Sequence, residues 1–254
     1  MVAAGMSLTT TLMMSCGEVP TLPDGIAYIT PVLLPLPTVA AGDTLRDSLG
    51  RATPLLVRAF TRDSQEVTGL AVRFIPTALP ADVTIDARGY LVARDTLRSV
   101  LLVGRVGDRL QTTVATLQIV PEPSAIARTV GDNAGDTVLA LPALRALPVT
   151  VTAVYRGSIT PVNGIIVRYR IDSLRPAGLP SGRAILTNES GATQRPDSTI
   201  AVDTTAAGGN AVRNVLVLAG SGVESVFVSA SARRLRDGTP VGGSPVRFVV
   251  RVRQ

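Results

Sequence analysis

Residues 67–74 read VTGLAVRF, and residues 162–169 read VNGIIVRY. The two stretches match position by position, with Gly69 and Gly164 in the third place. After each glycine, apolar residues alternate with residues that can face solvent. A period of two is the spacing of a strand with one face on a core, so both stretches are predicted to be half-buried β-strands. Each glycine stands at the entry to its strand, where a tight turn favours a positive φ.

The same alternation recurs along the chain, and no segment shows a convincing helical period. The clearest further examples are residues 149–155, 165–171 and 246–252. Turn-forming residues separate these segments, and short strands at this spacing are typical of antiparallel β-sandwiches. Within the two opening stretches we expect Leu70, Val72 and Phe74 to face inward, with Phe74 and its counterpart Tyr169 serving as core aromatics rather than as ligand platforms.

An internal repeat extends beyond these strands. Residues 55–74 align with residues 149–169, with one extra residue in the second turn. Further on, residues 99–103 (SVLLV) are matched to residues 214–218 (NVLVL), and Gly107 to Gly222. The repeat predicts two tandem sandwiches.

The predicted boundaries follow from the repeat and from the prolines. Residues 36–121 form the first domain, and residues 125–254 form the second, with an insertion near residues 172–197. The stretch Pro121–Ser124 reads PEPS and is the linker, whose two prolines restrict bending without abolishing it.

Residues 36–254 resemble the bacterial Ig-like (Big) families of invasin- and intimin-type adhesins and of surface lipoproteins. The resemblance lies in the V-x-G-hydrophobic-x-V-x-F pattern of residues 67–74 and 162–169, the latter with Tyr for Phe. It also lies in the D-x-x-G turn at residues 86–89, to which residues 203–209 are a looser match. The resemblance implies an all-β protein of two tandem immunoglobulin-like antiparallel β-sandwiches, and it implies little about function because fold does not determine function.

The N-terminal residues 1–16, MVAAGMSLTTTLMMSC, end in the one cysteine of the chain. They resemble a bacterial lipoprotein signal peptide, in which the final cysteine is lipidated and becomes the first mature residue. Ser15 fits the small residue before it, whereas Leu12 lies one place upstream of the usual leucine and a positive segment is missing. The resemblance implies a membrane anchor on Cys16, a Pro-rich tether over residues 17–35 and an outer-membrane lipoprotein facing the periplasm or the surface.

The composition excludes several kinds of chemistry. The chain has no His and no Trp, and its 25 basic residues are all Arg. A Ser-His-Asp or Cys-His catalytic site therefore cannot form, nor can a zinc site of His and Cys or a lysine-containing phosphate loop. We expect no catalytic residue, no cofactor and no metal.

The net charge of +6 needs a separate interpretation, because a basic protein can bind nucleic acid. Most Arg residues are scattered and alternate with apolar residues in strands, which predicts solvated strand faces and no nucleic-acid partner. The residues in question are Arg73, Arg168, Arg170, Arg247 and Arg251. The one close cluster is Arg233, Arg234 and Arg236.

The densest acidic segment is Asp132–Asp136, which reads DNAGD. Oxygen-rich loops of this kind can bind Ca²⁺, but the Glu that completes an EF-hand loop does not follow. Asp and Asn also favour ordinary turns, because their side chains bond the nearby backbone. A turn is therefore the preferred interpretation, and a calcium site stays open.

Two functions from different classes are compatible with these observations. The first is a non-enzymatic, lipid-anchored envelope protein that acts as an adhesion, spacer or structural module. The second is a secreted accessory module that binds polysaccharide or a partner protein and carries no lipid. In either case a partner would bind through loops or sheet edges, where strand addition is available.

Overall fold

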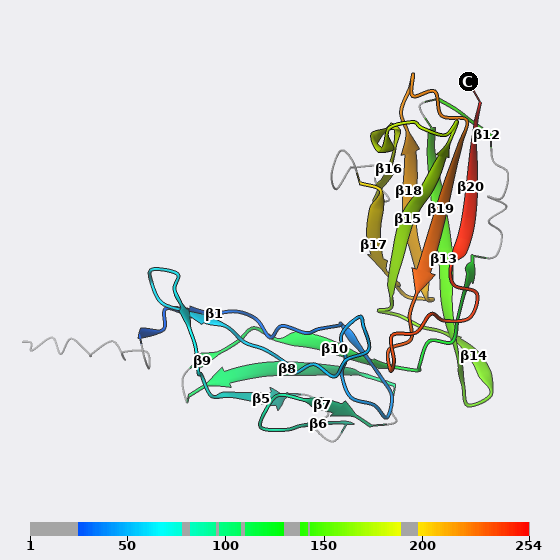
Figure 1. Cartoon of the computed structure of the whole chain (residues 1–254). Helices are drawn as coiled ribbons and strands as arrows, with labels where there is room; N and C mark the ends of the chain where they lie inside the picture. Colours follow the sequence, from blue (N-terminus) through cyan, green and yellow to red (C-terminus); the bar gives the residue numbers. More distant parts are fainter. Residues whose placement is uncertain are drawn as a thin grey trace, which may run out of the picture.

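The protein consists of two β-sandwiches joined end to end in a bent arrangement (Figure 1). The computed structural model describes residues 25–77, 82–94, 97–107, 110–129, 138–141, 143–188 and 198–253. The first sandwich contains β1 to β10 and the second contains β11 to β20. The prediction of an all-β protein with two immunoglobulin-like antiparallel sandwiches is confirmed by this topology.

The second sandwich has two sheets that face each other. One has the order β11-β13-β18-β16, with β14 paired to β13, and the other has the order β12-β20-β19-β15-β17. In an immunoglobulin-like domain, a four-stranded sheet packs on a second sheet, whose main strands here are β15, β19 and β20. The second sandwich has this arrangement. The strands are β11 (Ala125–Arg128), β12 (Val138–Ala140), β13 (Ala143–Tyr155), β14 (Ser158–Pro161), β15 (Ile166–Arg175), β16 (Ala184–Thr187), β17 (Ile200–Thr204), β18 (Asn210–Val217), β19 (Ser225–Ala232) and β20 (Val246–Arg253), with one 3₁₀ turn, η3 (Ser181–Arg183).

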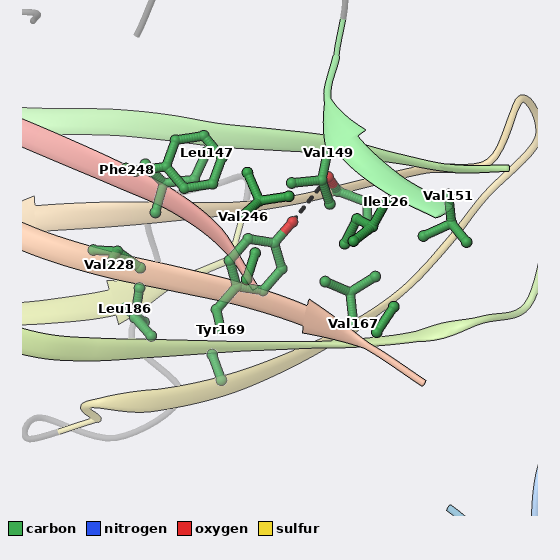
Figure 2. Packing of buried hydrophobic residues seen from close by; sticks show 14 of the residues in the cluster. Ile126, Leu147, Val149, Val151, Val167, Tyr169, Leu186, Val228, Val246 and Phe248 are labelled. Atoms are coloured by element: carbon green, nitrogen blue, oxygen red, sulfur yellow. Dashed lines mark hydrogen bonds between the residues drawn. The ribbon is translucent and has the colours of Figure 1, made fainter. Parts of the chain in front are cut away.

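Period-two alternation builds the core of this sandwich. In β15, Val167 and Tyr169 are buried while Arg168 and Arg170 are exposed, and β20 alternates in the same way. Tyr169 lies in the centre of the core (Figure 2), and its hydroxyl donates to the Ala211 carbonyl of the facing sheet at 3.0 Å. Burial, assisted by the nearby charge of a carboxylate, raises the pKa of this phenol, which remains a neutral donor. Its expected role as a core aromatic is confirmed.

In the first sandwich, one sheet matches its counterpart in the second sandwich, whereas the other is divided into two smaller pieces. The complete sheet has the order β2-β10-β8-β5, with β9 paired to β8, and the rest forms a β1-β3-β4 sheet and a β6-β7 hairpin. In both sandwiches an early short strand pairs in parallel with the last strand of its sheet, as β2 does with β10 and β12 does with β20. The strands are β1 (Tyr28–Ile29), β2 (Thr38–Ala40), β3 (Ala59–Phe60), β4 (Glu66–Val67), β5 (Val72–Pro76), β6 (Val83–Ile85), β7 (Leu91–Ala93), β8 (Ser99–Val106), β9 (Leu110–Gln111) and β10 (Ala115–Val120).

The first part of the predicted repeat is confirmed. β5 and β15 occupy the same place in their sheets, and Gly69 and Gly164 both have the positive φ expected at the entry, +77° and +74°. Phe74 is half-buried against the core of the first sandwich, as expected.

The second part of the repeat alignment is wrong. Residues 99–103 lie in β8, which pairs with β5 and β10, whereas residues 214–217 lie in β18, which pairs with β13 and β16 in the opposite sheet. The strand equivalent to β8 is β19, which pairs with β15 and β20. Apolar strands of similar length alternate alike in both sheets, so the pattern alone could not identify the partner strand.

Two domain features differ from the sequence-based boundaries. The tether over residues 17–35 is wrong from residue 25 onward, because Ile26 and Val32 are buried and β1 pairs with β3. These apolar side chains belong to the two buried clusters of the first sandwich and so are part of the fold. The expected insertion at residues 172–197 holds, within the described residues, the end of β15, η3 and the edge strand β16.

Candidate functional site

The structure does not gather the residues that carry the sequence-based site predictions. Cys16 and Asp132–Asp136 lie outside the described residues, so lipidation and the calcium alternative stay predictions. Within the part of the chain that the structure describes, no group of three or more His, Cys, Asp and Glu residues could hold a metal ion. No helix among these residues is long and apolar enough to span a membrane.

Several Asp residues serve turns. Asp47 accepts hydrogen bonds from the backbone N–H groups of Leu49 and Arg51, and Asp86 accepts from Arg88 and Tyr90. The bonds from Arg51 and Tyr90 are the largest causes that lower the pKa of these two carboxyl groups. These carboxylates therefore stabilise the turns in which they lie.

The most elaborate polar and apolar contacts lie at the joint between the sandwiches. Leu36, Ala40 and Val120 of the first sandwich are buried in the same apolar cluster as the core of the second. Leu235, from the loop after β19, is also part of it. Three apolar side chains of the first sandwich thus belong to the core of the second, and separating the domains would expose apolar surface to water at about 25 cal/mol per Å².

Thr38 and Gly164 meet at the centre of the joint. The Thr38 side chain is buried, and its hydroxyl donates to the Gly164 carbonyl at 3.2 Å. A β-carbon at Gly164 would lie 2.2 Å from Cγ2 of Thr38, so only glycine fits. The Gly164 turn is held from behind by Thr205, whose hydroxyl donates to the Val162 carbonyl and accepts from the N–H of Ile165.

Two turns also abut backbone to backbone. A β-carbon at Gly50 of the first sandwich would lie 2.3 Å from the carbonyl carbon of Asp237, and one at Gly238 would lie 2.6 Å from that of Leu49. Both glycines have a positive φ. This close approach fixes the distance between the domains at a second point.

Arg236 links the two sandwiches electrostatically. Its guanidinium donates to the Ala41 carbonyl at 3.3 Å and lies 3.6 Å from the Asp43 carboxylate, which also binds Arg46. Exposed ion pairs contribute at most about 1 kcal/mol each, but this network adds direction to the apolar contact. In the sequence, Arg236 appears only as one of three clustered arginines. The Asp237-Gly238 turn next to it was the one sequence feature that could have pointed to this contact.

The linker Pro121–Ser124 lies where it was predicted, between β10 and β11, but it is packed into the joint. Pro121 and Pro123 are buried, and the Ser124 N–H donates to the Thr152 carbonyl at 2.9 Å. One Glu122 oxygen accepts from the N–H of Arg236 at 3.2 Å. The linker therefore holds the domains in place instead of serving as a free hinge.

Glu122 is a carboxylate of the joint whose pKa is raised. Burial raises the pKa of its carboxyl group, although the N–H groups and the charge of the adjacent loop act in the opposite direction. Its second oxygen is buried without a hydrogen-bond partner. The charged form is thus partly uncompensated in the folded protein.

A groove of about 520 Å³ runs beside these contacts, between the two sandwiches. Its apolar lining includes Leu36, Leu49 and Ile166, and its polar lining includes Arg168 and Arg233. The arrangement has no nucleophile paired with a base. It can hold an angle between two domains and offer a cationic, partly apolar groove to a ligand.

Comparisons with known proteins give structural similarity only. No family model matches the chain. No curated protein matches it. Among solved structures, domains 4 and 5 of the S-layer protein SbsC are 15% identical, with 90% of this chain and 99% of that one covered, at a TM-score of 0.32. For the Yersinia pseudotuberculosis adhesin InvE the identity is 19%, and the match covers 88% of this chain and 58% of that one, at a TM-score of 0.36. For the D0-D1 domain of intimin the identity is 15%, and the match covers 88% of this chain and 98% of that one, at a TM-score of 0.25. TM-scores this low carry no conclusion about function.

The contact between Gly164 and Thr38 can be tested against a matched glycine. Gly157 also has a positive φ, but a β-carbon there meets nothing within 4 Å. Gly157→Ala should lower the free energy of unfolding by about 1–2 kcal/mol, the cost of the left-handed conformation. Gly164→Ala should lower it by about 2–4 kcal/mol, because overpacking adds to that cost. Urea unfolding measures both.

The rescue variant for this test is Thr38→Ser, which removes the clashing methyl group and keeps the hydroxyl. In the Thr38→Ser background, Gly164→Ala should cost no more than Gly157→Ala does. Equal costs of the two glycine variants in the wild-type background would contradict the assigned contact.

The raised pKa of Glu122 predicts a pH dependence of stability. The folded state binds the Glu122 proton more tightly than the unfolded state, so this group lowers stability as pH rises from below 4.5 through the raised folded pKa. Glu122→Gln removes this contribution, so its stability relative to wild type should increase with pH and be greatest at neutral pH. Chemical unfolding at a series of pH values measures the difference.

The control is Glu224→Gln, which makes the same charge change at an exposed position. It should show no such trend. A Glu122→Gln variant whose stability relative to wild type does not increase with pH would contradict the assignment.

Proposed function

We propose that this chain is a non-enzymatic cell-envelope protein, anchored by lipid on Cys16, whose two sandwiches act as a bent spacer and adhesion module. The packed joint is the observation that supports it best. A spacer must hold its outer domain at a defined position, and this joint combines a shared apolar cluster with the contact of Thr38 on Gly164. A flexible linker would not need either feature.

The direction of the chain fits such an anchor. β1, close to the start of the described residues, lies at the end of the first sandwich away from the second (Figure 1). A lipid on Cys16 would thus attach beside the first sandwich, and the second would extend away from the membrane. Acylation with more than one chain gives stable membrane binding, at about 0.8 kcal/mol per buried CH₂.

Side chains of the described residues also favour a structural role. Asp47 and Asp86 are engaged in turns, and Tyr169 is buried in a core. The chain contains no His that could serve as a general base. These observations support a binding or spacing function over catalysis.

The anchor is tested by Cys16→Ala expressed beside the wild type in a bacterium that processes lipoproteins. Wild-type protein should incorporate radiolabelled palmitate and fractionate with membranes, whereas the variant should do neither, because the cysteine sulfur carries the first acyl chain. Cys16→Ala leaves every described residue unchanged, so folding of the sandwiches serves as the internal control.

Equal fractionation of wild type and variant without palmitate label would contradict the anchor. Recovery of the wild-type chain from the culture supernatant would instead favour the second function, a secreted module that binds polysaccharide or a partner protein.

A further inference from the structure

The positive charge of the chain is concentrated in its second half. Residues 125–254 contain 15 Arg and 8 acidic residues, whereas residues 1–124 contain 10 Arg and 11 acidic residues. The net charge of +6 therefore belongs to the second sandwich and its loops. An asymmetry of this kind indicates an anionic partner when the charges share one surface.

The strand register places these arginines on one face. Arg170 of β15 and Arg247 of β20 both pair with Ser229 of the central strand β19, so they flank it on the outer side of the sheet. Four residues along β19, Ser225 is flanked in the same way by Arg175 and Arg251.

We name this surface the arginine face and define it by Arg168, Arg170, Arg175, Arg247 and Arg251, all of which are exposed. Figure 1 shows their strands β15, β19 and β20 side by side. These three strands contain a single carboxylate, Asp172, which binds Arg170 at 2.8 Å and accepts from Ser229 at 3.1 Å. The face is cationic overall, and Ser229, between Arg170 and Arg247, is buried.

A groove of about 760 Å³ lies in the middle of the arginine face. Its lining includes Arg170, Arg247, Ser173 and Phe227, and the Arg175 guanidinium lies 5.7 Å from the centre of the Phe227 ring. Arg168, at the end of the face, also lines the groove at the joint. The cationic surface is therefore continuous from the middle of β15 to the joint.

We propose that the arginine face binds a linear acidic polysaccharide. Guanidinium groups bind carboxylates in a bidentate manner, and the hydroxyl of the exposed residue Ser173 in the groove can bond a sugar hydroxyl. Neighbouring arginines lie two strands apart, about 10 Å, and the two rows lie four residues apart, about 13 Å. A chain with one charge in each sugar or pair of sugars matches this sparse spacing.

Other polyanions match the surface less well. Duplex DNA carries one charge per about 1.7 Å, far denser than the arginine rows. Single strands need exposed aromatic rings for stacking, and the two rings that line the groove are covered: Phe227 is half-buried beneath Arg175, and Phe248 is buried. An anionic membrane is the nearest competitor, because the exposed apolar residues Ile200 and Val202 of β17 pair with Arg170 and Arg168, and the vesicle arm of the experiment separates the two partners.

The probe is polygalacturonate, a linear polymer of uronic acids, and the protein is the purified full chain, with Cys16→Ala in every variant to avoid acylation. The inference is independent of the proposed anchor, so this experiment can succeed or fail whatever the outcome of the palmitate test. Affinity electrophoresis or biolayer interferometry should detect binding to polygalacturonate that weakens with salt, and no binding to neutral dextran.

The decisive variant is Arg170→Gln with Arg247→Gln, which should weaken binding by about tenfold or more because two charge-assisted contacts are lost. The matched control is Arg73→Gln with Arg105→Gln, an exposed cross-strand pair on the equivalent sheet of the first sandwich. This control removes the same charge and should change the affinity by less than about twofold, since it leaves the face intact. Thermal unfolding checks that both double variants are folded.

Equal weakening by the two double variants would overturn the proposal, because it would attribute binding to net charge alone. Tighter binding to anionic phospholipid vesicles or to duplex DNA than to polygalacturonate would overturn the choice of partner. Binding to dextran at the same affinity would overturn the role of charge.

Discussion

Gly164 lies so close to Thr38 that one added carbon would meet the threonine methyl group at 2.2 Å. Protein interiors tolerate little overlap, and their packing relaxes only in part, so this contact constrains how the second sandwich is seated on the first. The remaining features of the joint depend on that seating. Leu36 and Val120 reach the second core, and Arg236 reaches Asp43, only while the two surfaces stay this close.

The strands were predictable from the sequence because a single physical rule governs them. Alternation placed Val167 and Tyr169 inside and Arg168 outside, and the positive φ of Gly164 followed from its place before a strand. Pairing between distant strands was less accessible, since β8 and β18 have similar apolar patterns but belong to different sheets. The local alternation of apolar and polar residues indicates which face of a strand is buried, whereas the strand with which it pairs depends on the whole fold.

The joint and the arginine face could not be predicted in the same way, because both are made by residues far apart in the chain. Thr38 and Gly164 are 126 positions apart, and the repeat that singles out Gly164 gives no indication of its contact with Thr38. The strand arginines looked scattered in the sequence, yet the register of β15, β19 and β20 brings Arg170 and Arg247 to either side of Ser229. Sheets collect side chains across strands, so charge clustering has to be judged after the register is known.

The two sandwiches should behave as one fixed, bent unit, and a distance measured between them tests this rigidity. Spin labels on Gln65→Cys in the first sandwich and Ala177→Cys in the second, both exposed positions, can be introduced in a Cys16→Ala background. Pulsed electron paramagnetic resonance then gives the distribution of label distances. A fixed joint should give one narrow distribution, centred on the distance in the structure, that broadens in Gly164→Ala. A broad distribution in the protein with Gly164 intact would contradict a fixed joint.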